Sequence, residues 1–411
     1  MDQSAPLRIG CSTHFYQPES IKSLTSPPWP VLLKSMHSPP AGKASYLMIG
    51  GFLGAGKTTA IARLAHWLSA KGSRVGLITN DQGRQLVDTV MLSAEGFPTE
   101  EIAGGCFCCR FNSLVDAASR LTEQTRPEVF IAEPVGSCTD LVATVSYPLR
   151  RIYGDRFRIA PLSVLVDPVR AERVHGLSDG SQFSDKVLYI YRKQLEEADV
   201  LVINKCDLFD PTRLSRLRAV LAARYPQARL FEVSARSGQG LEPWFEYLSQ
   251  VDQVPRALMD VDYEIYADGE ARLGWLNATL LIRAPESLDG NQLLETLARQ
   301  TQQRLAGAGS EIAHLKMTLE TDSGLGDLAV VNLVRNDFVP ELSQSLQDQF
   351  EQGRLTLNMR AEGAPEMLQQ AVSAAADGCL TAFPGLHIQW EHLEFFKPGK
   401  PVPTHREQAQ V

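Results

Sequence analysis

The chain has 411 residues, of which 44% are hydrophobic and 21% are charged, an ordinary balance for a globular protein with roughly two or three domains. Its net charge of −8 argues against a general nucleic-acid-binding surface, and no apolar run approaches the about 20 residues that a membrane-spanning helix needs. We therefore expect neither nucleic acid nor a membrane among its partners.

The first 44 residues contain seven prolines and several serines, but no apolar core of the signal-peptide type. We expect residues 1–44 to be loosely ordered and the protein to be cytoplasmic. Met36 is an alternative start, because nothing upstream of Ser45 has the pattern of a helix or strand. In a reducing compartment the seven cysteines are expected to be thiols.

The stretch YLMIGGFLGAGKTTAIARL, Tyr46–Leu64, joins an apolar run to a glycine-rich turn and a helical pattern. This order of strand, turn and helix start has the spacing of a phosphate-binding P-loop, in which backbone amides and the positive helix end attract phosphate. Lys57 can reach the β and γ phosphates, and the Thr58 hydroxyl can bind Mg²⁺. The alternative is an ordinary glycine turn. The predicted nucleotide-binding residues of this loop are Gly51, Gly54, Ala55, Gly56, Lys57, Thr58 and Thr59.

A second strand is predicted at Val75–Thr79, after Gly72 ends the first helix. The polar segment NDQGRQLVD that follows lies where P-loop proteins place a mobile segment over the γ phosphate. Asp81 and Asp88 are therefore candidates for holding Mg²⁺ or its water. The alternative is that both are solvated loop acids.

Three cysteines, Cys106, Cys108 and Cys109, lie within four residues, just before a predicted helix at 112–123. Soft thiolate ligands favour zinc or monovalent copper, with Co²⁺ or Ni²⁺ possible. A structural zinc site usually has four protein ligands, so a set of three suggests an exchangeable metal or a further ligand from elsewhere. Buried inert cysteines and a redox thiol pair are the alternatives.

A third apolar strand, Val129–Ala132, ends in Glu133, with Gly136 three residues later. An acid at the end of a strand beside a P-loop belongs next to Mg²⁺. Cys138 lies just beyond, either as an extra metal or redox group or as a small packing residue.

The segment ADVLVINKCDL contains another strand, Val200–Ile203, and a polar motif at its end. The Asp207 carboxylate can accept from both N1–H and the exocyclic amine of guanine, whereas adenine would leave that charge unpaired. Lys205 can lie along the base, and Asn204 can tie this loop to the P-loop. After a strand at 230–233, the backbone of Ser234 and Ala235 can meet the guanine oxygen.

Five motifs occur here in the order found in the CobW family of P-loop GTPases, namely the glycine loop, CFCC, EPVG, NKCD and SAR. The chain resembles this family from about residue 45 to 251. The resemblance implies an α/β GTPase domain with a mostly parallel sheet, followed by a smaller α+β domain. It implies GTP/GDP, Mg²⁺ and Zn²⁺ as ligands, slow GTP hydrolysis, a client metalloprotein as partner and a possible homodimer. By motif, Lys57, Thr58, Glu133 and Asp81 take the catalytic roles, and Thr58 and Glu133 hold Mg²⁺. The same resemblance assigns guanine to Asn204, Lys205 and Asp207, and the transition metal to the three clustered cysteines. Eight histidines without a run disfavour metal storage.

From about Val254 the pattern changes to a second domain. Strands are predicted at 261–269, 273–285, 312–320, 328–336, 355–359 and 386–393, with a glycine turn at 324–326. Helices are predicted at 293–305 and 365–376, on one face of an α+β sandwich. His314, His387, His392 and Trp275 are expected to be packing or surface groups. The predicted domains are 45–253 and 254–398, with a mobile tail at 399–411.

Two classes of function fit this pattern best. The first is a GTP-hydrolysing metallochaperone that delivers a transition metal, zinc above all, to a client metalloprotein or supports its assembly. The second is a metal-responsive GTP-binding assembly or regulatory protein with little turnover. An ATP-dependent small-molecule kinase is a third option, which the NKCD motif disfavours.

Overall fold

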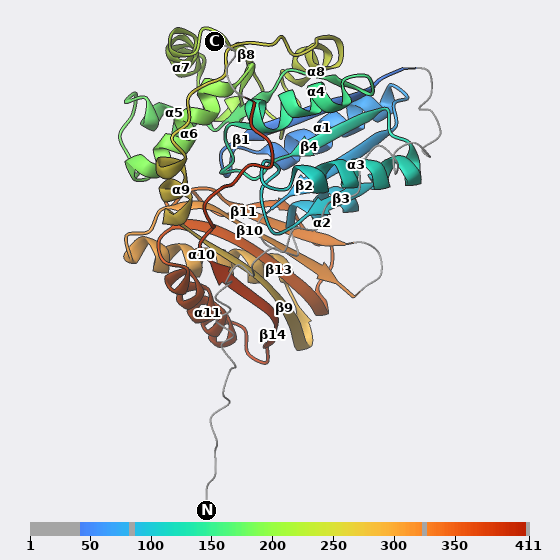
Figure 1. The fold of residues 1–411 in the computed structure, drawn as a ribbon. Helices are drawn as coiled ribbons and strands as arrows, with labels where there is room; N and C mark the ends of the chain where they lie inside the picture. Colours follow the sequence, from blue (N-terminus) through green and yellow to red (C-terminus); the bar gives the residue numbers. More distant parts are fainter. Residues whose placement is uncertain (1–41, 82–86, 323–326, 408–411) are drawn as a thin grey trace, which may run out of the picture. The chain divides into compact units, whose positions relative to one another are not determined.

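A computed structural model describes residues 42–81, 87–322 and 327–407 (Figure 1). The proline-rich residues 1–41, part of the polar segment after Asp81, the predicted glycine turn at 324–326 and the last four residues lie outside this range. Within the described ranges, no helix combines the length and apolar character needed to cross a bilayer.

The first half of the described chain forms an eight-stranded sheet in which every pair of neighbouring strands is parallel. Its order is β3-β2-β4-β1-β6-β7-β8, and β5 also pairs with β1. The central strand β1 reads as an unbroken apolar run because both faces of a parallel sheet are covered by helices. The strands are β1 (Ala44–Gly51), β2 (Val75–Asn80), β3 (Thr99–Ile102), β4 (Val129–Glu133), β5 (Phe157–Ile159), β6 (Ser163–Val166), β7 (Val200–Ile203) and β8 (Arg229–Glu232).

Helices follow most of these strands, as the alternating pattern predicts (Figure 1). They are α1 (Lys57–Ala70), α2 (Val87–Ala94), α3 (Phe111–Thr125), α4 (Tyr147–Tyr153), α5 (Pro168–Val174), α6 (Asp185–Glu197), α7 (Pro211–Arg224) and α8 (Leu241–Gln250). Two short helical turns, η2 (Val142–Ser146) and η3 (Cys206–Leu208), complete this half. The predicted α/β class is confirmed.

The second half forms a six-stranded antiparallel sheet of order β12-β11-β10-β13-β9-β14. Helices α10 (Gly290–Gly307) and α11 (Pro365–Ala382) pack together and against this sheet (Figure 1). The strands are β9 (Leu273–Leu288), β10 (Ile312–Thr321), β11 (Leu328–Leu333), β12 (Glu341–Gln344), β13 (Phe350–Glu362) and β14 (His387–Phe396). The expected additional α+β region is therefore present.

One predicted strand is wrong. Residues 261–269 were expected to be extended, but residues 263–269 belong to helix α9, Tyr263–Arg272. The Asp262 carboxylate caps this helix by accepting from the backbone N–H groups of Glu264 at 2.9 Å and Ile265 at 3.1 Å. Helix α9 also packs against α6 of the first sheet, and Tyr266 is buried there. This tertiary contact outweighs the alternating pattern of the sequence.

The tail also differs from the expectation of a mobile segment, because residues 400–407 make specific contacts. Arg406 donates to the Asp140 carboxylate at 2.7 Å, and the backbone N–H of Glu407 donates to the carbonyl of Ala143 at 3.0 Å. Several prolines prevent a helix here, but they leave enough N–H groups to attach the chain.

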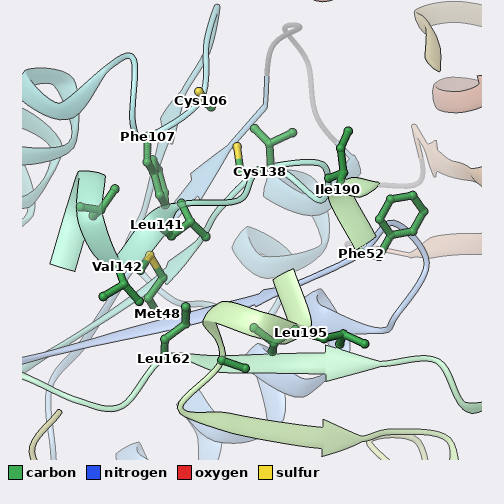
Figure 2. Close-up of a cluster of buried hydrophobic side chains, with 14 of the residues drawn as sticks. Met48, Phe52, Cys106, Phe107, Cys138, Leu141, Val142, Leu162, Ile190 and Leu195 are labelled. Carbon is green, nitrogen blue, oxygen red and sulfur yellow. The ribbon is translucent and has the colours of Figure 1, made fainter. Parts of the chain in front are cut away.

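The two sheets share part of their apolar core. Trp275 and Ala313 of the second sheet lie in the same buried cluster as Phe52 and Leu53, which flank the P-loop. Figure 2 shows this cluster around Met48 and Leu162, with Cys106 and Cys138 among its side chains. The described residues from 42 to 407 form one compact unit, so the boundary near residue 253 stays a prediction.

Candidate nucleotide and metal sites

The glycine loop between β1 and α1 has a backbone that only glycine adopts easily. Gly54 and Gly56 have φ values of 77° and 90°, and Gly56 is the N-cap of α1. A Cβ on Gly56 would lie 2.4 Å from the amide nitrogen of Asn204, and one on Gly51 would lie 2.5 Å from a backbone oxygen of Leu165. The loop thus leads directly into a helix N-terminus, as a phosphate cradle requires.

Four side chains meet where the sequence predicts Mg²⁺ and the phosphates. The Thr58 hydroxyl lies 2.7 Å from Asp88 Oδ1 and 3.1 Å from Glu133 Oε1, and the Lys57 ammonium lies 3.9 Å from Glu133 Oε1. Glu133 Oε2 is buried without a hydrogen-bond partner among the described residues. An unpaired buried carboxylate oxygen beside a threonine hydroxyl suits a hard cation with oxygen ligands, so these residues fit Mg²⁺. Asp88 is therefore part of this cluster rather than a solvated loop acid.

Burial controls the charges of this cluster. Burial and the nearby Asp88 raise the pKa of Glu133 to about 7. Burial also lowers the pKa of Lys57, although Glu133 opposes the effect. A cation or phosphate bound here would meet groups that water does not screen, so the electrostatic attraction would be strong.

Asp81 is placed differently from its predicted role beside Mg²⁺. Both of its carboxylate oxygens accept from Arg360 Nη2, at 2.8 and 2.9 Å, and Arg360 is fully buried on β13. Asp81 lines the nucleotide pocket but already forms this charge-assisted pair with the second sheet.

The predicted base-recognition loop follows β7. Asn204 links it to the P-loop, as expected, because its Nδ2 donates to the Ala55 carbonyl at 2.8 Å. Lys205 Nζ donates to the Gly54 carbonyl and to Asp167 Oδ2, each at 2.8 Å, and Asp207 is an exposed residue of the pocket lining. The loop therefore leaves the Asp207 carboxylate accessible to a base.

The backbone amides predicted to meet the guanine oxygen are already used within the protein. The N–H of Ala235 donates to Asn204 Oδ1 at 2.9 Å, and the N–H of Ser234 donates to the Gln239 carbonyl at 2.9 Å. The buried Asn204 amide oxygen is thereby satisfied, and the contact of this backbone with guanine stays a prediction. Both residues do line the pocket.

The pocket has a volume of about 670 Å³ and is lined by both halves of the chain. The second sheet contributes residues that sequence analysis missed or assigned to packing, namely Lys316, His314, Trp275 and Val334. Lys316 Nζ lies 3.2 Å from Thr58 Oγ1 and forms an ion pair with Asp88. No motif marks these positions, because the strands that carry them lie about 200 residues or more from the P-loop in the chain.

The three clustered cysteines converge as predicted. Their Sγ atoms lie 2.6 Å apart for Cys106 and Cys108, 3.1 Å for Cys106 and Cys109, and 3.7 Å for Cys108 and Cys109. Tetrahedral zinc with Zn–S distances of about 2.3 Å would need sulfur atoms about 3.8 Å apart, so small rotations of these side chains would form such a site. Cys106 and Cys108 are buried, whereas Cys109 is half-buried, so metal could enter from the side of Cys109.

Hydrogen bonds from neighbouring thiols favour the thiolate form of Cys106. The thiols of Cys108, Cys109 and Cys138 lower the pKa of Cys106 well below its usual value. Cys138 comes from the loop after Glu133 and lies beside the three converging thiols rather than within their group. Its thiol interacts with both Cys106 and Cys108.

The C-terminal tail covers the outer side of the cysteines. The Thr404 N–H donates to the Cys108 carbonyl at 2.8 Å, its hydroxyl donates to the Cys109 carbonyl at 3.0 Å, and the Val402 N–H donates to Cys109 Sγ at 3.3 Å. The His405 ring lies edge-on to Phe111, with 4.9 Å between ring centroids. The tail therefore stands between Cys109 and solvent.

The Asn80 side chain connects the nucleotide and cysteine segments. Asn80, the last residue of β2, donates from Nδ2 to the carbonyls of Ile102 at 2.9 Å and Gly105 at 2.7 Å. Its neighbour Asp81 faces the nucleotide pocket, and Gly105 precedes Cys106. The two segments thus share one buried amide.

Comparison with known proteins gives consistent matches. A model of the CobW/HypB/UreG nucleotide-binding domain matches residues 45–232. The chain is 31% identical to the zinc chaperone CobW of a Sinorhizobium species over 202 residues, which cover 44% of this chain and 56% of the relative. It is 29% identical to the zinc chaperone YeiR of Escherichia coli over 168 residues, 40% of this chain and 47% of the relative.

A more distant match is the zinc-regulated GTPase metalloprotein activator 1 of Dictyostelium discoideum, 23% identical over 270 residues, which cover 59% of this chain and 53% of the relative. The chain spans about half the length of each of these relatives. Among solved structures, the hydrogenase maturation factor HypB of Archaeoglobus fulgidus is 20% identical, covers 50% of this chain and 89% of that chain, and has a TM-score of 0.35. A TM-score this low supports no argument about the fold, which we assign from the strand order of this chain.

The matched range begins at β1 and ends with β8, so it contains the whole parallel sheet. It includes the P-loop, the clustered cysteines and the base-recognition loop. We conclude that residues 45–232, less than half of the chain, are similar to the nucleotide-binding domain of the CobW/HypB/UreG family.

Proposed function

We propose that this protein is a GTP-hydrolysing metallochaperone, which holds zinc at Cys106, Cys108 and Cys109 and transfers it to a client metalloprotein. The observation that carries the proposal is the hydrogen bond of Asn80 to Gly105, which joins the nucleotide-facing end of β2 to the cysteine loop. A direct connection of this kind lets nucleotide state change the hold on the metal. The names of the relatives, zinc chaperones and a zinc-regulated GTPase, support the choice of zinc.

In this proposal the P-loop residues hold the phosphates of GTP, with Thr58, Glu133 and Asp88 on the side of Mg²⁺. Bound Mg²⁺ would supply charge neutralisation of the β and γ phosphates. The Asp207 carboxylate selects guanine, and Asn204 holds the base loop against the P-loop at the carbonyl of Ala55. The chain's own part in the chemistry is to position the phosphates for attack by water.

We also propose Cys138 as the fourth sulfur ligand. It is buried, and it interacts with Cys106 and Cys108 from a separate loop. Four thiolates satisfy the tetrahedral preference of zinc. Because Cys138 lies five residues after Glu133, it would give the metal a second connection to the nucleotide site.

The proposal is tested by measuring GTP and ATP hydrolysis by anaerobically purified protein, with and without one equivalent of zinc. We expect hydrolysis of GTP in preference to ATP, an increase with zinc, and loss of activity in Lys57→Ala. Equal use of ATP would contradict the base assignment. GTP binding with unchanged, negligible turnover under all conditions would favour the alternative, a metal-responsive GTP-binding regulatory protein.

A further inference from the structure

Lys316 places a cation from the second sheet at the proposed Mg²⁺ position. Its ammonium donates to Thr58 Oγ1 at 3.2 Å and forms an ion pair with Asp88 Oδ1. These atoms belong to two of the side chains that we assign to Mg²⁺ or its water. The Lys316 side chain is 16% exposed, so water screens this contact weakly.

The position of Lys316 on β10 follows from the strand itself. Leu315 and Met317 on either side are buried in the core of the second sheet, so Lys316 points to the opposite face. His314, two residues earlier, lies on the same face and lines the same pocket. The ammonium is thus carried to Thr58 by a strand paired on both sides, with β11 and β13.

Two acids and two lysines face one another in this cluster. Asp88 and Glu133 are two acids, and Lys57 and Lys316 are the two cations that face them. A divalent cation bound to Thr58 and Asp88 would add two positive charges at the atoms that Lys316 contacts. Lys316 and the divalent cation would then occupy the same oxygen lone pairs of Thr58 and Asp88, so one of them must leave these atoms. Lys57 is held in the P-loop for the phosphates, so Lys316 is the one displaced.

We propose that Lys316 and Mg²⁺ compete for Thr58 and Asp88, so that loading of Mg²⁺ with nucleotide detaches β10 from the nucleotide site. The inference rests on the proposed nucleotide function and assigns a role to the second sheet. That sheet would sense whether Mg²⁺ is bound.

The neighbouring contacts between the sheets would remain. Asn358 Oδ1 accepts from the N–H of Val87 at 2.7 Å, and Arg335 donates to Asp167 Oδ1 at 3.1 Å. Neither Val87 nor Asp167 is a proposed Mg²⁺ ligand. Mg²⁺ therefore changes one contact of the second sheet and leaves others to hold it in place.

The test is a Mg²⁺ titration of the full chain with a fluorescent GDP analogue at fixed concentration. In Lys316→Met, which keeps the apolar stem but removes the charge, half-maximal Mg²⁺-dependent binding is expected at about tenfold lower Mg²⁺, because a charge-assisted competitor is gone. Lys316→Arg should need as much Mg²⁺ as the wild type. Arg354→Met is the matched control, since Arg354 pairs with Glu391 at the surface of the same sheet, and it should change nothing.

An unchanged Mg²⁺ requirement in Lys316→Met would overturn the competition. A higher requirement would also overturn it, and would make Lys316 a phosphate ligand instead. If the variant does not fold, hydrogen exchange of the wild type decides the question, because amides of residues 312–321 should exchange faster with Mg²⁺ and GDP than with GDP alone. Equal exchange would refute the inference. Failure of the wild type to bind any guanine nucleotide would refute the proposed function itself, an outcome distinct from all of these.

Discussion

Cys138 illustrates how much the surroundings of one side chain decide its chemistry. Cys206 and Cys379 are also buried thiols, but they lie in other parts of the fold, within η3 and α11. Of these three thiols, that of Cys138 alone influences the ionisation of Cys106 and Cys108. Burial alone therefore does not make a cysteine a ligand, whereas convergence with other thiols does.

Replacement of Cys138 by serine should weaken zinc binding. Loss of one of four thiolate ligands should lower the affinity at least about tenfold, since even outer-shell partners contribute that much. Competition with a chromophoric chelator under anaerobic conditions measures the change. Cys379→Ser is the matched control and should keep the wild-type affinity. An affinity equal to the wild type in Cys138→Ser would limit the site to the three motif cysteines.

His175 predicts a pH dependence of stability. Burial first, then Arg224 and Arg192, lower its pKa to about 4, and neither ring nitrogen has a hydrogen-bond partner among the described residues. The folded state binds this proton more weakly than the unfolded state, whose pKa is near 6.5. The stability contributed by His175 is therefore complete above about pH 6.5 and is lost as the pH falls toward 4.

In His175→Phe this acid-dependent loss should disappear. The ring contact with Tyr225, at 5.9 Å between centroids, can be kept by phenylalanine. Urea unfolding at pH 7.5 and pH 5 should show that the variant loses about 1 to 2 kcal/mol less than the wild type on acidification, a figure reduced for partial exposure. Equal losses in both proteins would show that His175 is protonated without cost in the fold.

At the scale of elements, the tail from Val402 to Glu407 acts as a cover on the cysteine loop. Its three hydrogen bonds to Cys108 and Cys109 involve backbone and hydroxyl groups, and ion pairs of Arg406 with Asp140 and of Glu407 with Arg151 anchor the end of the segment. Each such bond contributes little net free energy, about 1 kcal/mol. The cover can therefore open without unfolding of the domain.

Removal of residues 400–411 should speed the release of zinc to a chelator. We expect an increase in the release rate of roughly five- to tenfold, because loss of about 1 kcal/mol or slightly more lowers the barrier to opening by that factor. Stopped-flow measurement with a chelator in excess gives the rate. A shorter truncation of residues 408–411 leaves every described tail contact in place and should behave as wild type. If both truncations release zinc at the wild-type rate, the tail does not control access.

At the scale of the whole molecule, two short connections join the nucleotide and metal sites. One runs from Asp81 through Asn80 to Gly105, and the other runs along the loop from Glu133 to Cys138. Both start at the carboxyl ends of neighbouring parallel strands, β2 and β4. The sheet thus brings together two segments that would otherwise be independent loops.

These connections predict reciprocal binding. If a GTP analogue changes zinc affinity by some factor, zinc must change the affinity for the analogue by the same factor, and roughly 5- to 150-fold is typical. Asn80→Ala should reduce that factor while each ligand still binds alone. Equilibrium titrations of zinc with no nucleotide, GDP and the analogue measure it.

Asn291→Ala is the matched control, because Asn291 also forms side-chain hydrogen bonds to a distant backbone, that of Leu346 in the second half of the chain. This variant should leave the coupling factor between zinc and the GTP analogue unchanged. Identical zinc affinities in all three nucleotide states of the wild type would leave a passive metal site beside a nucleotide site. Coupling that persists in Asn80→Ala would assign it to the loop between Glu133 and Cys138.

The sequence by itself determined the features that depend on local spacing. The glycine loop before Lys57, the apolar strand ending in Glu133, the Asn204 motif and the three cysteines within four residues could all be predicted, because each function is carried by neighbours in the chain. The parallel sheet could also be predicted, because apolar runs alternate along the chain with helical patterns. The helix α9 was missed because its alternating pattern is outweighed by packing against α6.

Only the tertiary structure decided which distant groups meet these motifs. Lys316 and Arg360 lie more than 200 residues from Thr58 and Asp81 in the chain, yet they are their partners in space. The same holds for the tail, where Val402 and Thr404 reach Cys109. The register and packing of two sheets set these contacts, and a periodicity of 2 or 3.6 residues carries no information about which strand a side chain will face.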